Sequence, residues 1–275
     1  MKKSLIAVDQ EESRETRYSF HEIVRQYMYE KLVESNEEVN IRTRHLKYFL
    51  NLSEQAETDL RGPAQMEWHT HLNDERDNLR AALAWADKTN VEAGLYITSR
   101  LGRFWENFDL LEENYWLSTF LQKPESYGFP RARAKALHMH MPVLNFLNQV
   151  DTWRSTAKEC LELYRALGDQ PGEMDVLLIT AGEISSAAQR VELFQQALIL
   201  TQVSGDTWQR ARALYEMGWN CSKEERLDHW QQAITLFRQT GDWRSLAQCL
   251  SATGNFALLN GKLELTQKCL DEAPY

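Results

Sequence analysis

Two pairs of histidines come nearest, in residue type and spacing, to a metal-binding or catalytic set: His69 with His71, and His138 with His140. Imidazole is a common zinc ligand and the usual proton carrier near neutral pH. A single residue separates the members of each pair, however, and side chains two positions apart on a helix point to different faces. We therefore interpret these histidines as polar or half-buried side chains and expect no metal site.

The carboxylates and the nucleophilic side chains give no active-site pattern either. Glu173, Asp175 and Glu183 could suggest paired carboxylates, but on helices such residues are typical of a solvated face. No serine or cysteine stands in a setting such as G-x-S-x-G. We expect no catalytic activity and no cofactor.

Composition and charge narrow the class of protein. The 275 residues carry a net charge of −9, with 26% charged and 43% hydrophobic side chains, which is typical of an ordered chain. The negative charge disfavours non-specific binding to nucleic acid or to an anionic membrane. The apolar run Leu5–Val8 is too short for a signal peptide, and no stretch is long enough to span a membrane. We expect a cytoplasmic protein.

The cysteines form no ligand pattern. Cys160, Cys221, Cys249 and Cys269 lie far apart, and no C-x-x-C occurs. Their spacing favours small, buried, reduced thiols over disulfides or metal ligands.

A regular repeat organises the second half of the chain. Glycines recur at an interval of 36 residues, at Gly182, Gly218 and Gly254, and the dipeptide Gly-Asp recurs at 168–169, 205–206 and 241–242. Glycine suits the left-handed end of a helix, and aspartate suits the start of the next. A period in the thirties with helical chemistry indicates stacked helix pairs. The repeat glycines are expected in mid-helix, where close approach of the paired helix would offset their cost.

The predicted helix pairs begin after the segment 123–130, which contains two prolines and a glycine and therefore interrupts any helix. The predicted pairs are 131–148 with 150–167, 172–187 with 188–203, 207–222 with 223–239, and 243–259 with 262–273.

The first half is also predicted to be mostly helical. Short β-prone runs at 4–8 and 17–20 predict a hairpin that packs on the helix beginning at His21. The helices expected after it are 40–60, 65–73, 74–87, 91–108 and 110–121. The predicted fold class is all-α, a helical solenoid with a short N-terminal β-hairpin, in three parts: 1–35, 36–122 and 131–275.

The repeats resemble tetratricopeptide repeats. Gly254, Ala257 and Gly261 fall at the spacing of that family's small residues, with Thr266 where alanine is usual. The units at Gly182 and Gly218 are one helical turn shorter than the family pattern. The resemblance covers about 131–275 and implies an α-α superhelix.

A second resemblance covers residues 17–121. The segment from Arg17 to Leu32 (RYSFHEIVRQYMYEKL) resembles the end of the winged-helix region of STAND-type signalling ATPases, of the NB-ARC and AP-ATPase kind. The segments Leu60–Trp68 and Leu72–Trp85, then Arg103-Phe-Trp and Trp116-Leu, resemble the helical part that follows it in bacterial members. Phe108-Asp109 and Glu113-Asn114 depart from the family's usual Arg-Gly and Glu-Gly turns.

This resemblance implies the sensor part of a switch protein that controls signal transduction or transcription. The sequence holds no G-x-x-x-x-G-K-[ST] phosphate loop, so the nucleotide-binding module is expected elsewhere in the full-length protein. The implied partner is a protein or peptide, or a small-molecule inducer, with no membrane partner. The last helix pair ends at Tyr275 without a polar cap, and we expect it to be shielded by something or the chain to be a piece of a longer protein.

Two other functions stay open at this point. One is a free-standing tetratricopeptide scaffold, unrelated to any ATPase. The other is a regulator that answers a small molecule and contacts DNA through a wing bearing Lys2, Lys3, Arg14 and Arg17. Acidic residues in the same hairpin oppose contact with DNA. We therefore prefer a structural role for the wing and do not expect nucleic acid as a partner.

The tetratricopeptide resemblance also implies where a partner would bind, because the first helix of each pair lines the concave face. Counted from the repeat glycines, the inward positions are Ile179, Glu183, Arg212, Tyr215, Trp219, Gln248, Ser251 and Asn255. Exposed tyrosine, tryptophan and arginine anchor many interfaces. Trp219 is the first candidate, and its alternative is a place in the core between repeats.

Overall fold

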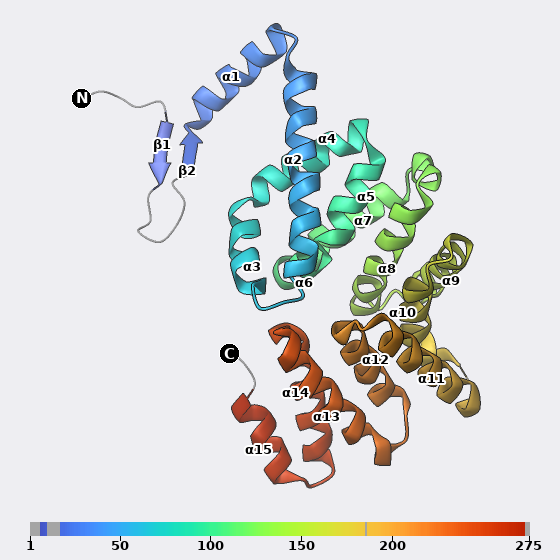
Figure 1. Ribbon diagram of the computed structural model, residues 1–275. Coiled ribbons are helices and arrows are strands. Elements are labelled where there is room, and N and C mark those ends of the chain that lie inside the picture. Colours follow the sequence, from blue (N-terminus) through green and yellow to red (C-terminus); the bar gives the residue numbers. More distant parts are fainter. Residues whose placement is uncertain (1–5, 10–16, 185, 273–275) are drawn as a thin grey trace. The chain divides into compact units, whose positions relative to one another are not determined.

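The computed structural model describes residues 6–9, 17–184 and 186–272 (Figure 1). The contacts divide the chain into two compact units, Met1–Tyr48 and Phe49–Tyr275, which are described separately. Within the described residues, no helix is long and apolar enough to cross a membrane.

The first unit contains two short strands and the helix that follows them. Strands β1 (Ile6–Asp9) and β2 (Arg17–Phe20) pair antiparallel, with Ile6 opposite Phe20. The second strand coincides with the predicted run 17–20. Helix α1 (Glu22–Glu34) follows, and the Tyr29 hydroxyl donates to Glu38 at 3.0 Å, at the start of α2 (Glu38–Asp59).

The proposed DNA-contacting residues of the wing fall mostly outside the described part of the chain. Lys2, Lys3 and Arg14 lie among residues 1–5 and 10–16, which the structure does not describe. Only Arg17 belongs to a described strand. Contact between the wing and DNA therefore stays a prediction.

The second unit begins within α2 and is helical throughout its described residues. Its first helices are α3 (Gln65–Asp74), α4 (Arg76–Thr89), α5 (Val91–Arg100), α6 (Gly102–Phe108) and α7 (Leu110–Leu121), followed by the 3₁₀ helix η1 (Pro124–Gly128).

One predicted helix in this region is wrong, because 91–108 is divided into α5 and α6 at Leu101. The break lies where the backbone passes close to another helix. A Cβ atom on Gly102 would lie 2.3 Å from Cε, the flexible end of the Met139 side chain on α8. The sequence pattern did not predict this break.

The remaining helices form consecutive packed pairs. They are α8 (Pro130–Phe146), α9 (Val150–Leu167), α10 (Gln170–Thr180), α11 (Ala187–Ser204), α12 (Thr207–Asn220), α13 (Lys223–Thr240), α14 (Trp243–Leu259) and α15 (Leu263–Glu272). Helix α8 packs on α9, α12 on α13, and α14 on α15. Among the described residues the architecture is therefore all-α apart from the two short strands.

The Gly-Asp dipeptides end and start helices as predicted. Gly168, Gly205 and Gly241 have φ angles of 64°, 68° and 72°, the left-handed region that favours glycine. The aspartate after each glycine caps the next helix, accepting a hydrogen bond from the backbone N–H three residues on, at distances of 2.9 to 3.0 Å. These local contacts explain the regular helix boundaries.

The repeat glycines behave differently from one another. At Gly218 a Cβ atom would lie 2.1 Å from the Trp230 indole nitrogen, and at Gly254 it would lie 3.2 Å from Cys269 Cβ, so close approach of the next helix is confirmed at both. Gly182 was also predicted in mid-helix, and this is wrong. Helix α10 ends at Thr180, and Gly182 lies in the short 3₁₀ helix η2 (Ala181–Glu183).

Large aromatic side chains fill the core of the second unit. Phe49, Phe104, Trp105, Phe120 and Trp230 are among its fully buried members. All four cysteines are free thiols; three are buried as predicted, whereas Cys221 is partly exposed because it directly follows the end of α12.

Candidate functional site

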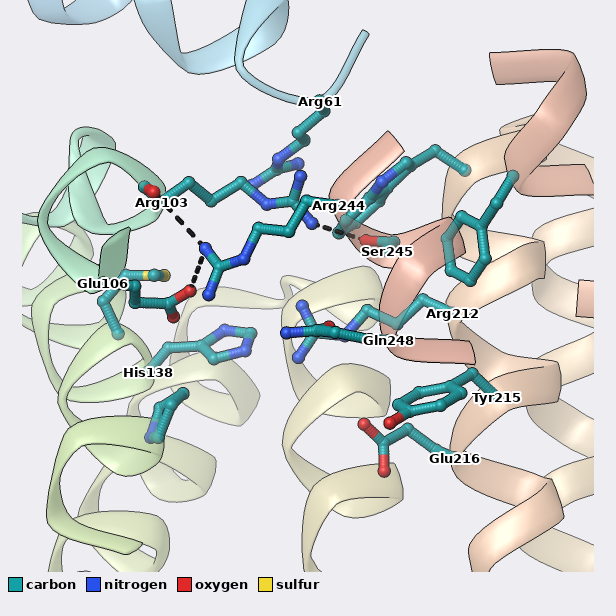
Figure 2. A pocket seen from close by; sticks show the side chains of 14 residues that line it. Arg61, Arg103, Glu106, His138, Arg212, Tyr215, Glu216, Arg244, Ser245 and Gln248 are labelled. Carbon is teal, nitrogen blue, oxygen red and sulfur yellow. Dashed lines mark hydrogen bonds and ion pairs between the residues drawn. The ribbon is translucent and has the colours of Figure 1, made fainter. Parts of the chain in front are cut away.

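A cavity of about 200 Å³ lies within the second unit and is lined by helices distant in sequence (Figure 2). We call it the arginine cavity. Its lining contains Arg61 from the α2–α3 turn, Arg103 and Glu106 from α6, His138, Met139 and Pro142 from α8, Trp208, Arg212, Tyr215 and Glu216 from α12, Phe237 from α13, and Arg244, Ser245 and Gln248 from α14. The lining carries four guanidinium groups against two carboxylates.

Asp242 and Arg103 form an ion pair at the cavity wall. Asp242 is fully buried, and its Oδ2 atom accepts hydrogen bonds from Arg103 Nη1 at 2.8 Å, Trp208 Nε1 at 2.7 Å and Ser245 Oγ at 2.7 Å. The second nitrogen of Arg103 donates to Ser245 Oγ at 2.7 Å. Burial opposes ionisation of Asp242, but Arg103 and the Ser245 and Trp208 donors together lower its pKa below the usual value.

Arg244 is the second cavity arginine that forms an ion pair within the protein. Its guanidinium group pairs with Glu106 and also donates to the Arg103 carbonyl oxygen at 3.3 Å. In Figure 2 the guanidinium groups of Arg103 and Arg244 lie together, beside Glu106 and Ser245. Two ion pairs thus join α6 to α14 and to Asp242, the residue that caps α14.

The buried Gln65 side chain holds the α13–α14 turn against α3. Its Nε2 donates to the Gly241 carbonyl at 3.1 Å, and its Oε1 accepts from the Arg244 backbone N–H at 3.2 Å. The same nitrogen also donates to the Gly62 carbonyl at 3.1 Å. Gly241 and Arg244 lie on either side of Asp242 in the chain. The Gln65 side chain therefore fixes the backbone that carries Asp242 into the cavity wall.

Three of the four arginines surround one indole ring. The guanidinium carbons of Arg61, Arg103 and Arg212 lie 4.5, 5.2 and 5.7 Å from the centroid of the Trp208 ring. Cation–π attraction holds such groups over an aromatic face without using their hydrogen bonds. Trp208 therefore gathers positive charge at one place while leaving donors available.

Arg61 and Arg212 differ from the other two arginines in their partners. Among the residues the structure describes, neither guanidinium group donates a hydrogen bond to an acceptor, and the nearest carboxylate oxygen to Arg61 is that of Glu57, at 3.8 Å. Glu57 is shared with Lys135 at 2.5 Å and with Arg100 at 3.6 Å. Two cavity arginines thus retain unused N–H donors.

Burial is the main cause of the pKa shifts in the cavity, and the charges acting on these groups include Asp175 as well as Arg212. Burial lowers the pKa of His138 to about 4, helped by the positive charge of Arg212 and, more weakly, Arg61, so its imidazole is neutral at pH 7. The His138 Nε2 atom is buried and has no hydrogen-bond partner among the described residues. Burial also raises the pKa of Glu216, against the opposing effect of Arg212.

Five of the eight residues predicted for the concave face line cavities. Arg212, Tyr215 and Gln248 line the arginine cavity. Ile179, Glu183 and Arg212 line a second cavity of about 490 Å³ beside Trp153 and Asn145. Arg212 belongs to both, so it is the predicted residue that lies most centrally.

Trp219, Ser251 and Asn255 lie further along α12 and α14, outside the lining of the arginine cavity. All three are exposed, Trp219 to 49%. The Trp219 ring also lies edge-on to Trp230, with centroids 5.0 Å apart, and to Tyr215, at 6.2 Å. Trp219 is therefore partly packed between repeats and partly available at the surface.

The histidine pairs do not converge. His69 is buried, whereas His71 on the same helix is exposed, so the two face different ways as predicted. His138 lines the cavity, while His140 Nε2 makes a 2.9 Å hydrogen bond with Asn114 Oδ1. Glu173 and Glu183 form ion pairs with Arg165 and Arg154.

The sequence prediction missed every arginine and glutamate of the cavity except Arg212. The missed residues with charged or aromatic side chains are Arg61, Arg103, Glu106, Trp208, Glu216, Phe237 and Arg244. A usable signal existed, because Arg103 is a charged residue directly before two aromatic core residues, Phe104 and Trp105. An arginine at such a place is partly buried and must find a partner.

Three proteins with similar sequences carry the names of transcriptional regulators. They include "Putative HTH-type transcriptional regulator Mb0914c" of Mycobacterium bovis and regulators of the same type in two strains of Mycobacterium tuberculosis. Each is 30% identical over 236 residues, which cover 78% of this chain and 25% of the relative. No protein-family model matches the chain.

The chain spans about a quarter of the length of the curated relatives it matches. It is therefore similar to one region of large transcriptional regulators. The names of these relatives are those of regulators and not of enzymes.

Proposed function

We propose that this chain is the sensor region of a STAND-type transcriptional regulator and that its paired helices bind a protein, a peptide or a small inducer. The observation that carries the proposal is the match of 78% of the chain to one quarter of proteins named HTH-type transcriptional regulators. In such an arrangement the nucleotide-binding and DNA-binding steps belong to other regions of the full-length protein, and this region needs no catalytic residue.

The geometry supports binding more than chemistry. The paired helices fit a tetratricopeptide-like superhelix. Gly-Asp dipeptides separate successive pairs, with the glycines at Gly168, Gly205 and Gly241. The face implied by that resemblance contains cavity-lining side chains, Arg212 and Tyr215 among them. Aromatic and arginine side chains are the types that contribute most to interfaces.

The test compares transcript levels in three strains of the source organism: wild type, a strain lacking the gene, and a strain carrying Tyr215→Ala with Trp219→Ala. We expect the deletion to change a defined set of transcripts and the double substitution to change the same set, with the protein still present by immunoblot. A matched strain with the exposed Tyr127→Ala on η1 should behave as wild type.

Two results would count against the proposal. A deletion that leaves all transcripts unchanged would exclude a transcriptional role. A double substitution without effect, in a strain where the deletion has one, would place sensing somewhere other than on the α12 face.

A further inference from the structure

The arginine cavity presents unused positive charge. Arg103 and Arg244 are bound by Asp242 and Glu106, but Arg61 and Arg212 donate to no acceptor among the described residues. Both guanidinium groups lie over the same Trp208 ring, which holds their positions. Both side chains are partly buried, and Arg61 reaches Glu57 only at 3.8 Å. Like charges gathered in this way repel one another, as the lowering of the Arg103 pKa by Arg61 and Arg244 indicates, so this arrangement favours an anion.

The surrounding polar groups suit the same kind of ligand. His138 is neutral, and its Nε2 atom has no partner among the described residues, so it can donate a hydrogen bond to an oxygen. In Figure 2 the His138 ring faces the side chains of Arg212 and Gln248. Gln248 is exposed, so the cavity can be reached from solvent on that side.

The size of the cavity limits the ligand. About 200 Å³ is somewhat larger than the ~150 Å³ cavity that holds a benzene molecule. A small dicarboxylate or a short phosphorylated metabolite is of a size that fits within it. Guanidinium groups recognise both of these through paired N–H donors.

We infer that the arginine cavity binds a small organic anion, a carboxylate or a phosphate ester, held by Arg212 and Arg61 with His138 as an additional donor. This inference rests on the proposed sensor function and gives the chemical class of its inducer. Arg103, Arg244, Asp242 and Glu106 form the wall that keeps the two binding arginines in place. An anion bound there would contact α8 and α12 and the turn after α2 at once.

The test is isothermal titration calorimetry of the full chain with sodium succinate and with sodium phosphate, at ionic strength held constant with sodium chloride. Succinamide serves as the neutral counterpart of succinate. We expect saturable binding of at least one of the two anions, with succinamide binding at least ten times more weakly. The stronger of the two identifies the head group as carboxylate or phosphate.

The matched variants are Arg212→Gln and Arg210→Gln, two residues apart on α12. Arg210 is exposed and forms no ion pair with another described residue, so it controls for loss of net charge. Arg212→Gln should raise the dissociation constant at least ten-fold, and Arg210→Gln should change it less than two-fold. Arg61→Gln is the second binding variant, used if Arg212→Gln lowers the melting temperature.

The inference is overturned if neither anion binds the wild-type chain, or if Arg212→Gln and Arg210→Gln bind equally well. Tighter binding of a penta-glutamate peptide than of both small anions, lost in Arg212→Gln, would assign the cavity to an acidic peptide instead. Failure of anion binding with intact transcript control leaves the proposed function standing. Anion binding without any transcript change would refute the function and not the site.

Discussion

Arg103 and Asp242, 139 residues apart in the chain, form an ion pair of 2.8 Å in which the carboxylate is fully buried. The pair joins α6 to the start of α14, and the same carboxylate caps α14 through the Ser245 N–H at 3.0 Å. One aspartate therefore performs a local task and a long-range task. The capping of α14 can be read from the repeat pattern. The ion pair with Arg103 connects the first helices of the second unit to the last.

Removing the carboxylate charge is expected to destabilise the fold strongly. Asp242→Asn leaves Arg103 without its counter-charge in a buried position, at an expected cost of about 3 to 5 kcal/mol in the free energy of unfolding. Urea denaturation measures this. In a double-mutant cycle, Arg103→Met with Asp242→Asn should cost less than the two single changes added together. Strict additivity would show that the two side chains are not energetically coupled.

Glu113 should make the protein less stable as pH rises. It is fully buried, neither carboxylate oxygen has a hydrogen-bond partner among the described residues, and burial together with Glu106 raises its pKa to about 9. Because the folded pKa lies above the unfolded value of 4.5, its full contribution to stability is present below pH 4.5 and is lost as pH rises towards 9. The loss is at most roughly 1.4 kcal/mol for each pH unit.

Glu113→Gln keeps the shape of the protonated side chain and removes this loss. The variant should therefore melt at a higher temperature than wild type at pH 8, and the two should converge near pH 4. The exposed Glu125→Gln serves as control and should match wild type at both values. A Glu113→Gln variant that gains nothing at pH 8 would show that Glu113 is ionised in the folded protein.

Gly218 should not accept a side chain. A Cβ atom there would lie 2.1 Å from the Trp230 Nε1 atom, and Trp230 is 1% exposed and bonded to the Tyr215 carbonyl. Overpacking of this kind costs about 1 to 3 kcal/mol, so Gly218→Ala should lower the urea midpoint. Gly128→Ala, where no atom lies within 4 Å, is the control and should be nearly neutral. Equal midpoints for the two variants would refute the close approach of α13.

Gln65 should control the α13–α14 turn from α3. Gln65→Ala removes the hydrogen bonds to the Gly241 carbonyl and from the Arg244 N–H, and leaving such buried groups unpaired costs about 1 to 3 kcal/mol. Amide hydrogen exchange at Arg244 should become faster in this variant. The exposed Gln122→Ala should leave that exchange rate unchanged. An unaltered rate in Gln65→Ala would show that the turn is held without the amide.

The sequence by itself determined the features that depend on neighbours along the chain. The Gly-Asp boundaries at Gly168, Gly205 and Gly241 are readable because a left-handed glycine and a capping aspartate act within a few residues. The paired helices follow from the 36-residue interval for the same reason. The division of the predicted helix 91–108 at Leu101 was not predicted.

Only the tertiary structure decided which polar side chains share a site. Arg61, Arg103, Arg212 and Arg244 meet around one cavity although they come from four separate elements, because helix packing and not spacing in the chain sets their distances. The repeat pattern pointed to Arg212, Tyr215 and Gln248, which lie on the repeat helices themselves. Arg61 and Arg103 lie outside the repeats, so no periodicity could place them. The ion pair between Arg103 and Asp242 exists only once the chain has folded back on itself.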